Sequence, residues 1–169
     1  MSVYLYLPFG HEFVRKNRHA FNAYMNSDCF PEQGVEIDPE TAEEEYLLLS
    51  GKEVEEDVDF KWKGKEFKIT CMMTVEVNEK WNDIWNVCTP IPQRKQGYLA
   101  LLFDYYWKKV NNVTTRLYVV VGNEYLLKIY EKFGFNVINE SKSEYTMERK
   151  FKKQRSTRQT TWRSRSMKQ

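Results

Sequence analysis

One stretch near the end of the chain, RLYVVVGNEYLLKIYEKFGF at residues 116–135, constrains the fold more than any other. Its first six residues are a near-continuous apolar run, which is typical of a strand covered on both faces of a sheet. Gly122 breaks the run, Asn123 is suited to cap a helix, and Gly134 is suited to end one. The stretch therefore predicts a buried strand followed by a helix over residues 124–133.

Hydrophobic periodicity and turn residues predict the other elements. A second helix is expected to start at Asp38, with Pro39 at its first position, and to end before Gly51. The remaining predicted elements are strands near 3–7, 58–62, 65–77, 83–89, 136–138 and 144–149, and helices over 12–25 and about 98–110. The order is β-α-α-β-β-β-α-β-α-β-β. It predicts a single α/β domain over residues 1–150, with a mixed, mostly antiparallel sheet flanked by helices.

Length and composition favour an intracellular protein. With 169 residues the chain can bury one core. No apolar run reaches membrane-spanning length and no basic region precedes an apolar one at the start, so we expect no membrane segment and a cytoplasmic location, with the nucleus as the alternative. Cys29, Cys71 and Cys88 are odd in number and lack metal-ligand spacing. They predict reduced thiols in a reducing compartment and no metal site.

Charge is strongly segregated along the chain. Residues 32–59 carry twelve acids and one base, whereas residues 149–169 carry nine bases and no acid. The acidic segment is either a solvated face or a field that attracts a cationic partner. Residues 151–169 lack periodicity and predict a disordered basic tail. Four roles are open to such a tail. It could solvate the protein, bind nucleic acid through residues 149–169, fold over the acidic segment, or serve as a localisation signal.

Two motifs carry a family resemblance. NVCTPIPQRKQGYLALL, residues 86–102, is followed 26 residues after Gly97 by NEYLLKIYEKFGF. The pair resembles the GNAT superfamily of N-acetyltransferases, over about residues 3–150. In that family the loop reads Gln/Arg-x-x-Gly-x-Gly/Ala. Arg94 and Gly97 match its first two positions, and Leu99 departs from the third. The later motif matches at Asn123, Tyr130, Gly134 and Phe135.

The residue types of the loop indicate anion binding independently of the family resemblance. A glycine turn entering a helix points backbone N–H groups outward at the positive end of the helix dipole. The amides of Gln96, Gly97, Tyr98 and Leu99 are therefore candidates to hold a pyrophosphate, with charge added by Arg94 and Lys95. A solvated strand-to-helix turn is the alternative. The Leu99 side chain either packs inward or narrows the phosphate site, and in the second case the fold would lack its cofactor.

The resemblance also implies roles for residues outside the loop. Tyr130 corresponds to the family's general acid for the departing thiolate, and Asn123 to a cofactor contact. A protonated amine needs a base, and Asp83 corresponds to the family's strand-start carboxylate. Glu76, Glu79 or a water chain are the reserve bases. Val87 and Thr89 are expected to give backbone contacts to the pantetheine arm, and Cys88 is expected to be a small core residue.

These observations predict an N-acetyltransferase that moves the acetyl group of acetyl-CoA to a primary amine by direct attack. The acceptor would be a cationic amine, such as a polyamine, a small amine, or a lysine or N-terminal amine. The alternative is a catalytically silent GNAT-like module that binds nucleic acid or a protein through its basic tail. The protein is expected to be a monomer or a homodimer. Transfer of a longer acyl group is the third option.

Overall fold

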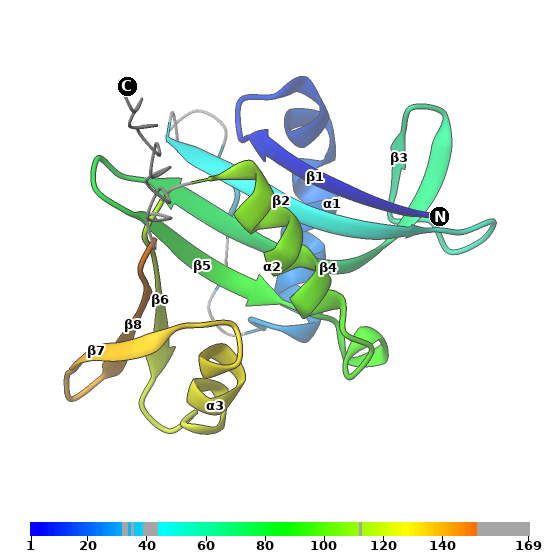
Figure 1. The fold of residues 1–169 in the computed structure, drawn as a ribbon. Coiled ribbons are helices and arrows are strands. Elements are labelled where there is room, and N and C mark those ends of the chain that lie inside the picture. The colour runs from blue at the N-terminus through cyan, green and yellow to red at the C-terminus, as the bar shows by residue number, and fades with distance from the viewer. Residues whose placement is uncertain (32–33, 35, 39–43, 112, 152–169) are drawn as a thin grey trace, which may run out of the picture.

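The structure, a computed structural model, describes residues 1–31, 34, 36–38, 44–111 and 113–151. In these residues eight strands form one sheet, ordered β1-β2-β4-β5-β6-β8-β7 with β3 paired to β4, and three α-helices cover it (Figure 1). The strands are β1 (Ser2–Pro8), β2 (Glu45–Glu53), β3 (Phe60–Trp62), β4 (Lys65–Val77), β5 (Asn82–Cys88), β6 (Thr115–Val120), β7 (Asn136–Glu140) and β8 (Glu144–Arg149). The helices are α1 (Glu12–Asp28), α2 (Tyr98–Lys109) and α3 (Tyr125–Glu131), and a 3-10 turn spans Ile91–Gln93.

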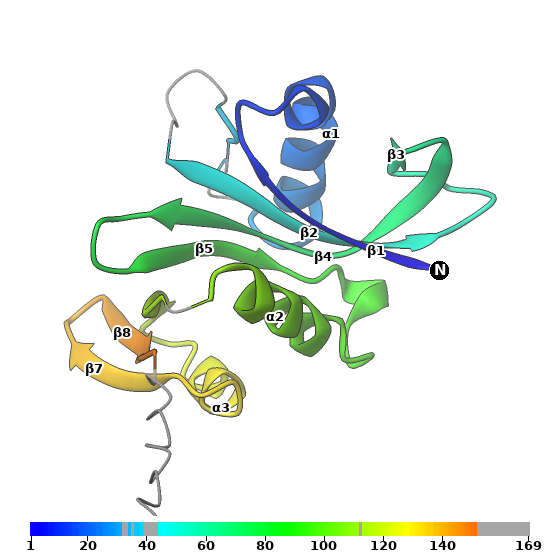
Figure 2. The ribbon, with the colours of Figure 1, turned by 45° about the horizontal axis from the view of Figure 1, so that its top comes forward.

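The helices lie on opposite faces of the sheet. Helix α1 covers one face over the first strands, and α2 and α3 lie on the other face (Figure 2). Each face has its own apolar core. Leu47 and Leu49 of β2 pack in the cluster under α1, whereas Leu48 packs in the cluster under α2. Strand β2 is therefore buried on both sides.

The prediction of a helix from Asp38 to Gly51 is wrong for the residues that the structure describes. Residues 45–53 form strand β2, which pairs with β1 and β4. A strand buried on both faces reads as an uninterrupted apolar run, and a short run of this kind does not distinguish strand from helix. Gly51 does not end a helix. A Cβ at this position would lie 2.7 Å from Cζ of Phe60, so the glycine permits a close approach at a bulge in β2.

Two neighbouring strands diverge in the middle of the sheet. All described strand pairs are antiparallel except β5 with β6, and these two pair only from Asn82–Thr115 to Ile84–Leu117. Beyond those residues they separate like the arms of a V (Figure 1). The prediction of a mixed, mostly antiparallel sheet flanked by helices is confirmed.

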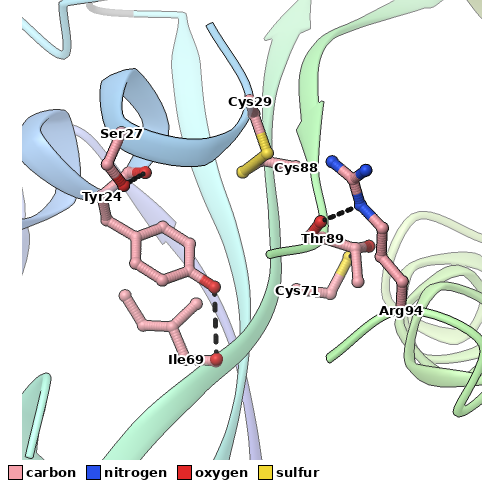
Figure 3. The surroundings of a disulfide bond; sticks show 8 residues. All are labelled: Tyr24, Ser27, Cys29, Ile69, Cys71, Cys88, Thr89 and Arg94. Atoms are coloured by element: carbon pink, nitrogen blue, oxygen red, sulfur yellow. Dashed lines mark hydrogen bonds between the residues drawn. A yellow bond between two sulfur atoms is a disulfide. The ribbon is translucent and has the colours of Figure 1, made fainter. Parts of the chain in front are cut away.

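The prediction of reduced thiols is wrong for Cys29 and Cys88 and confirmed for Cys71. Cys29, just after α1, forms a disulfide with Cys88 at the end of β5, with Cα atoms 5.7 Å apart (Figure 3). Cys71 is free and buried. Because of this disulfide, the cysteine content no longer indicates a reducing compartment. No helix in the described part of the chain is long and apolar enough to cross a membrane. The predicted tail lies outside the described residues from position 152 onward.

Candidate functional site

The loop between β5 and α2 opens the helix as the sequence predicts. Gly97 occupies the N-cap position with φ 79° and ψ 8°, a left-handed conformation that favours glycine. The first backbone bond of the helix runs from the Leu101 amide to the Gly97 carbonyl. In the described residues, the backbone amides of Gln96, Gly97, Tyr98 and Leu99 donate no hydrogen bond. These amides are therefore available to an anion at the N-terminus of a 12-residue helix.

The side chain of Leu99 points into the protein. Leu99 is half-buried and packs against the core cluster that includes Leu102 and Phe103 of α2. Of the two outcomes considered for this departure from the family pattern, inward packing is the one observed. The backbone amide of Leu99 therefore keeps its place in the loop without its side chain blocking the amides before it.

The basic residues of the loop have different roles. The Nε atom of Arg94 donates a hydrogen bond of 2.9 Å to the carbonyl of Thr89, which ties the loop to the end of β5 (Figure 3). Gln96 donates from its side-chain amide to the carbonyl of Pro92 at 3.0 Å. Lys95 is exposed, with φ 61°. The loop is thus held by side-chain bonds at both Arg94 and Gln96, while positive charge stays beside the helix N-terminus.

Strand β5 has one unpaired edge next to this loop. Because pairing with β6 stops at Ile84, the β6-facing edge of residues 85–88 has no strand partner in the described chain. Asn86 has φ 54° at a bulge, where the register against β4 shifts. Val87 packs toward the α2 side, and Thr89 directs its hydroxyl to Cys71 Sγ at 3.3 Å. Such an edge can accept an extended ligand in the way that it would accept a further strand.

Tyr130 of α3 lies on the α2 side of the sheet, in the cluster against which Val87 packs. Its side chain is 7% exposed and packs in the same cluster as Cys71, the residue that Thr89 contacts. Burial raises the pKa of Tyr130 to about 12, with smaller contributions from Cys71 and Tyr125. The phenol therefore keeps its proton at neutral pH and can donate it. The structure brings Tyr130, Cys71 and Thr89 together on the α2 side of the sheet.

Asn123 does not cap α3 with its side chain. The N-cap position is Glu124, and it makes no side-chain capping bond. Instead, the carboxylate of Glu124 accepts a bond from the Gly122 amide at 3.0 Å. Asn123 is exposed and contributes its carbonyl to the amide of Leu126. Gly134 follows the helix with φ 90°, in agreement with its predicted role in ending it.

Asp83 lies on the opposite face of the sheet. Ile84 points to the α2 side, so its neighbour Asp83 points away from it. Asp83 is 7% exposed, and its carboxylate accepts three hydrogen bonds. Oδ2 accepts from Asn78 Nδ2 at 2.6 Å and from Trp81 Nε1 at 3.1 Å, and Oδ1 accepts from the Tyr118 hydroxyl at 2.7 Å. Asp83 is therefore a buried carboxylate with three hydrogen-bond donors.

An aromatic pair lies beside this carboxylate, and sequence reasoning missed it. The rings of Trp85 and Tyr118 stack with centroids 4.5 Å apart and an angle of 10°. Trp85 is 39% exposed and donates from Nε1 to Glu76 at 3.2 Å. Glu79, the other reserve base, is exposed in the turn before β5. Because side chains alternate along β6, the sequence indicates that Tyr118 and the apolar Leu117 point to opposite faces of the sheet. The sequence does not give the register that brings Tyr118 to Asp83.

Acidic side chains adjoin the aromatic pair. Glu45 of β2 pairs in register with Glu76 of β4. Burial raises the pKa of Glu45, and the charges of Glu76 and Asp38 raise it further. The acidic segment thus reaches the face of the sheet that carries Asp83 and Trp85.

A separate cavity of about 1050 Å³ opens at the other end of α2, bordered by residues 132–134 after α3 and by β7 and β8. The Arg149 guanidinium lies 3.8 Å from the centroid of the Trp107 ring in its wall. Desolvation lowers the pKa of Arg149. None of the predicted acid, base or cofactor residues lines this cavity, so size alone does not identify the site.

Comparison with known proteins agrees with the fold. No protein-family model matches the sequence, and no curated protein matches it. Solved structures do match over most of the chain. An acyl-CoA N-acyltransferase from Pseudomonas aeruginosa has a TM-score of 0.62 and 13% identity, covering 88% of this chain and 99% of its own. ElaA from Escherichia coli has a TM-score of 0.61 and 14% identity, with coverages of 89% and 100%.

A third match was solved with a ligand. Arabidopsis thaliana Naa50, in complex with the bisubstrate analogue CoA-Ac-MVNAL, has a TM-score of 0.57 and 16% identity, with coverages of 89% and 99%. At these identities the likeness establishes the architecture. The chain has the acyl-CoA N-acyltransferase fold of GNAT proteins, and the fold implied by the sequence motifs is confirmed.

Proposed function

We propose that this protein is an N-acetyltransferase that moves the acetyl group of acetyl-CoA to a primary amine. The observation that carries the proposal is the divergence of β5 and β6 directly beside the amide-rich N-terminus of α2. The divergence leaves an open strand edge at residues 85–88 for the pantetheine arm, and the loop leaves amides for the pyrophosphate. Naa50, which shares the fold, was solved with a CoA-containing analogue, which supports the same cosubstrate here.

We assign the proton donor and the proton acceptor of the reaction to opposite faces of the sheet. Tyr130 lies on the α2 side, where the thioester sulfur would end, and would donate its proton to the thiolate as the C–S bond breaks. Asp83 lies on the α1 side, where the amine would arrive, and would receive the proton that the ammonium loses. The reaction is direct attack of the amine on the thioester carbonyl.

A cationic acceptor is supported by the acidic residues near Trp85. Glu45 and Glu76 lie side by side on neighbouring strands, and the exposed Trp85 ring offers its π face to a cation. A polyamine, a small amine, and a lysine or N-terminal amine share this chemistry. The proposed enzyme acts without a metal, as a monomer or homodimer.

Thermal unfolding with and without millimolar acetyl-CoA tests the cofactor half of the proposal. A ligand at 100 times its Kd stabilises by about 2.7 kcal/mol, which is several degrees for a domain of this size. Gly97→Asp should abolish the shift because it puts an anion at the phosphate site. Gly64→Asp is the matched control, since Gly64 has φ 78° against 79° at Gly97, and at both positions a Cβ would meet no atom within 4 Å.

A screen with acetyl-CoA and four acceptors, spermidine, an aminoglycoside, a lysine peptide and a peptide with a free N-terminus, then tests transfer. Acetylation of one class would support the proposal and identify the acceptor. A shift in the unfolding temperature with acetyl-CoA, without acetylation of any of the four acceptors, would refute acetyl transfer. No shift in the wild type would favour the silent module, whose nucleic-acid binding should fall with salt and disappear on truncation at Lys150.

A further inference from the structure

The carboxylate expected to act as the base is shielded from a substrate. Asp83 is 7% exposed, and donors from Asn78, Trp81 and Tyr118 occupy both of its oxygens. Because so little of Asp83 is exposed, an incoming amine has little room to reach the carboxylate directly. Of the three donors, only Tyr118 belongs to a strand that borders the opening between β5 and β6.

Tyr118 stands where that opening begins. The last paired residues of the two strands are Ile84 and Leu117, so Tyr118 is the first residue of β6 beyond the pairing. Its ring is fixed by stacking on Trp85, which in turn bonds Glu76. Its hydroxyl is fixed by the 2.7 Å bond to Asp83. A hydroxyl that donates to Asp83 retains oxygen lone pairs that can accept from a further donor.

We propose that Tyr118 contacts the attacking amine and passes the amine's proton to Asp83. This inference rests on the proposed acetyl transfer and names the residue that activates its acceptor. Tyr118 is thus the group in contact with substrate, and Asp83 acts through it.

The proton transfers balance as follows. An N–H bond of the ammonium breaks and its proton joins the Tyr118 oxygen, while the Tyr118 proton moves to Asp83 Oδ1. The neutral amine forms a bond to the thioester carbonyl carbon. When the C–S bond breaks, the nitrogen loses a second proton to solvent, and the thiolate gains one from Tyr130, which solvent then reprotonates. Asp83 returns its proton to water through Tyr118. The products are an amide, a thiol and one released proton.

The surroundings keep Tyr118 in the neutral form that a relay needs. Burial, followed by the hydrogen bond to Asp83, raises the pKa of Tyr118, and Arg116 opposes this. The titratable groups on the same face as the pair in the described residues are Arg116 of β6, Glu76 of β4, and Glu144 and Glu148 of β8. Tyr106 of α2 lies on the other face, where the charge of Asp83 still acts on it. Glu148 holds Arg116 through an ion pair of 2.9 Å, so that cation has its own partner.

The test compares Tyr118→Phe with the wild type in acetyl transfer to spermidine, or to the lysine peptide if spermidine is not accepted. The variant keeps the ring that stacks on Trp85 and loses only the hydroxyl. Tyr105→Phe is the control, because Tyr105 also stacks on an aromatic ring, that of Tyr4, but lies on α2. Rates are measured from pH 7 to pH 10, together with the acetyl-CoA KM and thermal stability.

We expect Tyr118→Phe to lower kcat about 100-fold at pH 7, within the usual range for general acid–base groups. The deficit should shrink to less than about tenfold near pH 10, because solution then supplies free amine. The acetyl-CoA KM should stay unchanged, and Tyr105→Phe should behave like wild type. A deficit that is constant with pH, or a rate within about twofold of wild type, would overturn the relay alone. Absence of transfer by the wild type itself, with binding intact, would refute the proposed function and the relay with it.

Discussion

Breaking the Cys29–Cys88 disulfide should cost this protein a large part of its stability. The bond closes a loop with a sequence separation of 59 residues. In the chain-entropy model, a loop of this length lowers the entropy of the unfolded chain by an amount worth about 4 kcal/mol at 25 °C. For a domain of this size that corresponds to a shift of about 8–16 °C in Tm. The total stability of a domain is typically only about 5–15 kcal/mol, so the effect is easily measured.

The position of the bond explains why the loss should affect the whole domain. Cys88 is fully buried in β5, between Val87 and Thr89, and Cys29 follows α1 (Figure 3). The bond therefore ties the helix that covers one face of the sheet to the strand expected to hold the cofactor. Reduction leaves both side chains in place as thiols, so it changes the unfolded state more than the packing of the folded one.

Guanidinium unfolding of oxidised wild type, reduced wild type and Cys29→Ser provides the assay, with mass spectrometry to count the hydrogens gained on reduction. The midpoint should fall in the last two samples, and reductant should not change the midpoint of Cys29→Ser. Equal midpoints for oxidised and fully reduced wild type would refute the entropic reasoning. A midpoint of Cys29→Ser that falls on reduction would show that another bond was responsible.

Three further predictions concern single residues. Tyr130→Phe should lower kcat about 100-fold and leave the Kd of acetyl-CoA unchanged, as measured by steady-state rates and calorimetry, and equal effects on both would contradict the acid role. Gly51→Ala should destabilise by about 1–3 kcal/mol in denaturant unfolding, because its Cβ would approach Phe60 Cζ to 2.7 Å. Cys71 should resist alkylation at pH 8 in the native protein, since burial raises the pKa of its thiol to about 12 and keeps it protonated. In denaturant without reductant Cys71 alone should be labelled, and labelling of all three cysteines would contradict the disulfide.

Local signals in the sequence were sufficient where the structure is determined locally. Gly97 lies at the N-cap of α2, where the sequence indicated a glycine turn entering a helix, and Gly134 has the positive φ of a helix terminator. The alternation near Leu7 and the turn between Trp62 and Lys65 likewise indicated strands β1, β3 and β4. Each of these features depends on a few neighbouring residues, so a pattern in the chain is enough to indicate it.

Features that depend on distant partners were not predictable in this way. The run Leu47–Leu49 is a strand because both of its faces meet a core, and nothing within the run says so. Cys29 and Cys88 are brought together by the packing of α1 on β5, which spacing does not reveal. The register that pairs Asp83 with Arg116 also carries Tyr118 to the carboxylate. A residue expected to act alone is therefore part of a network.

The placement of the candidate groups follows from one irregularity in the sheet. If β5 and β6 paired along their whole lengths, backbone bonds would fill the edge at residues 85–88, and the two faces of the sheet would be separated. Because pairing ends at Ile84, no backbone bonds between β5 and β6 lie between the α2 side, with Tyr130 and the loop amides, and the α1 side, with Asp83 and Tyr118. In the proposed reaction, an amine on the α1 side would attack the carbonyl carbon of a thioester held on the α2 side. The departure at Leu99 does not disturb this arrangement, because its side chain packs into the core behind the loop.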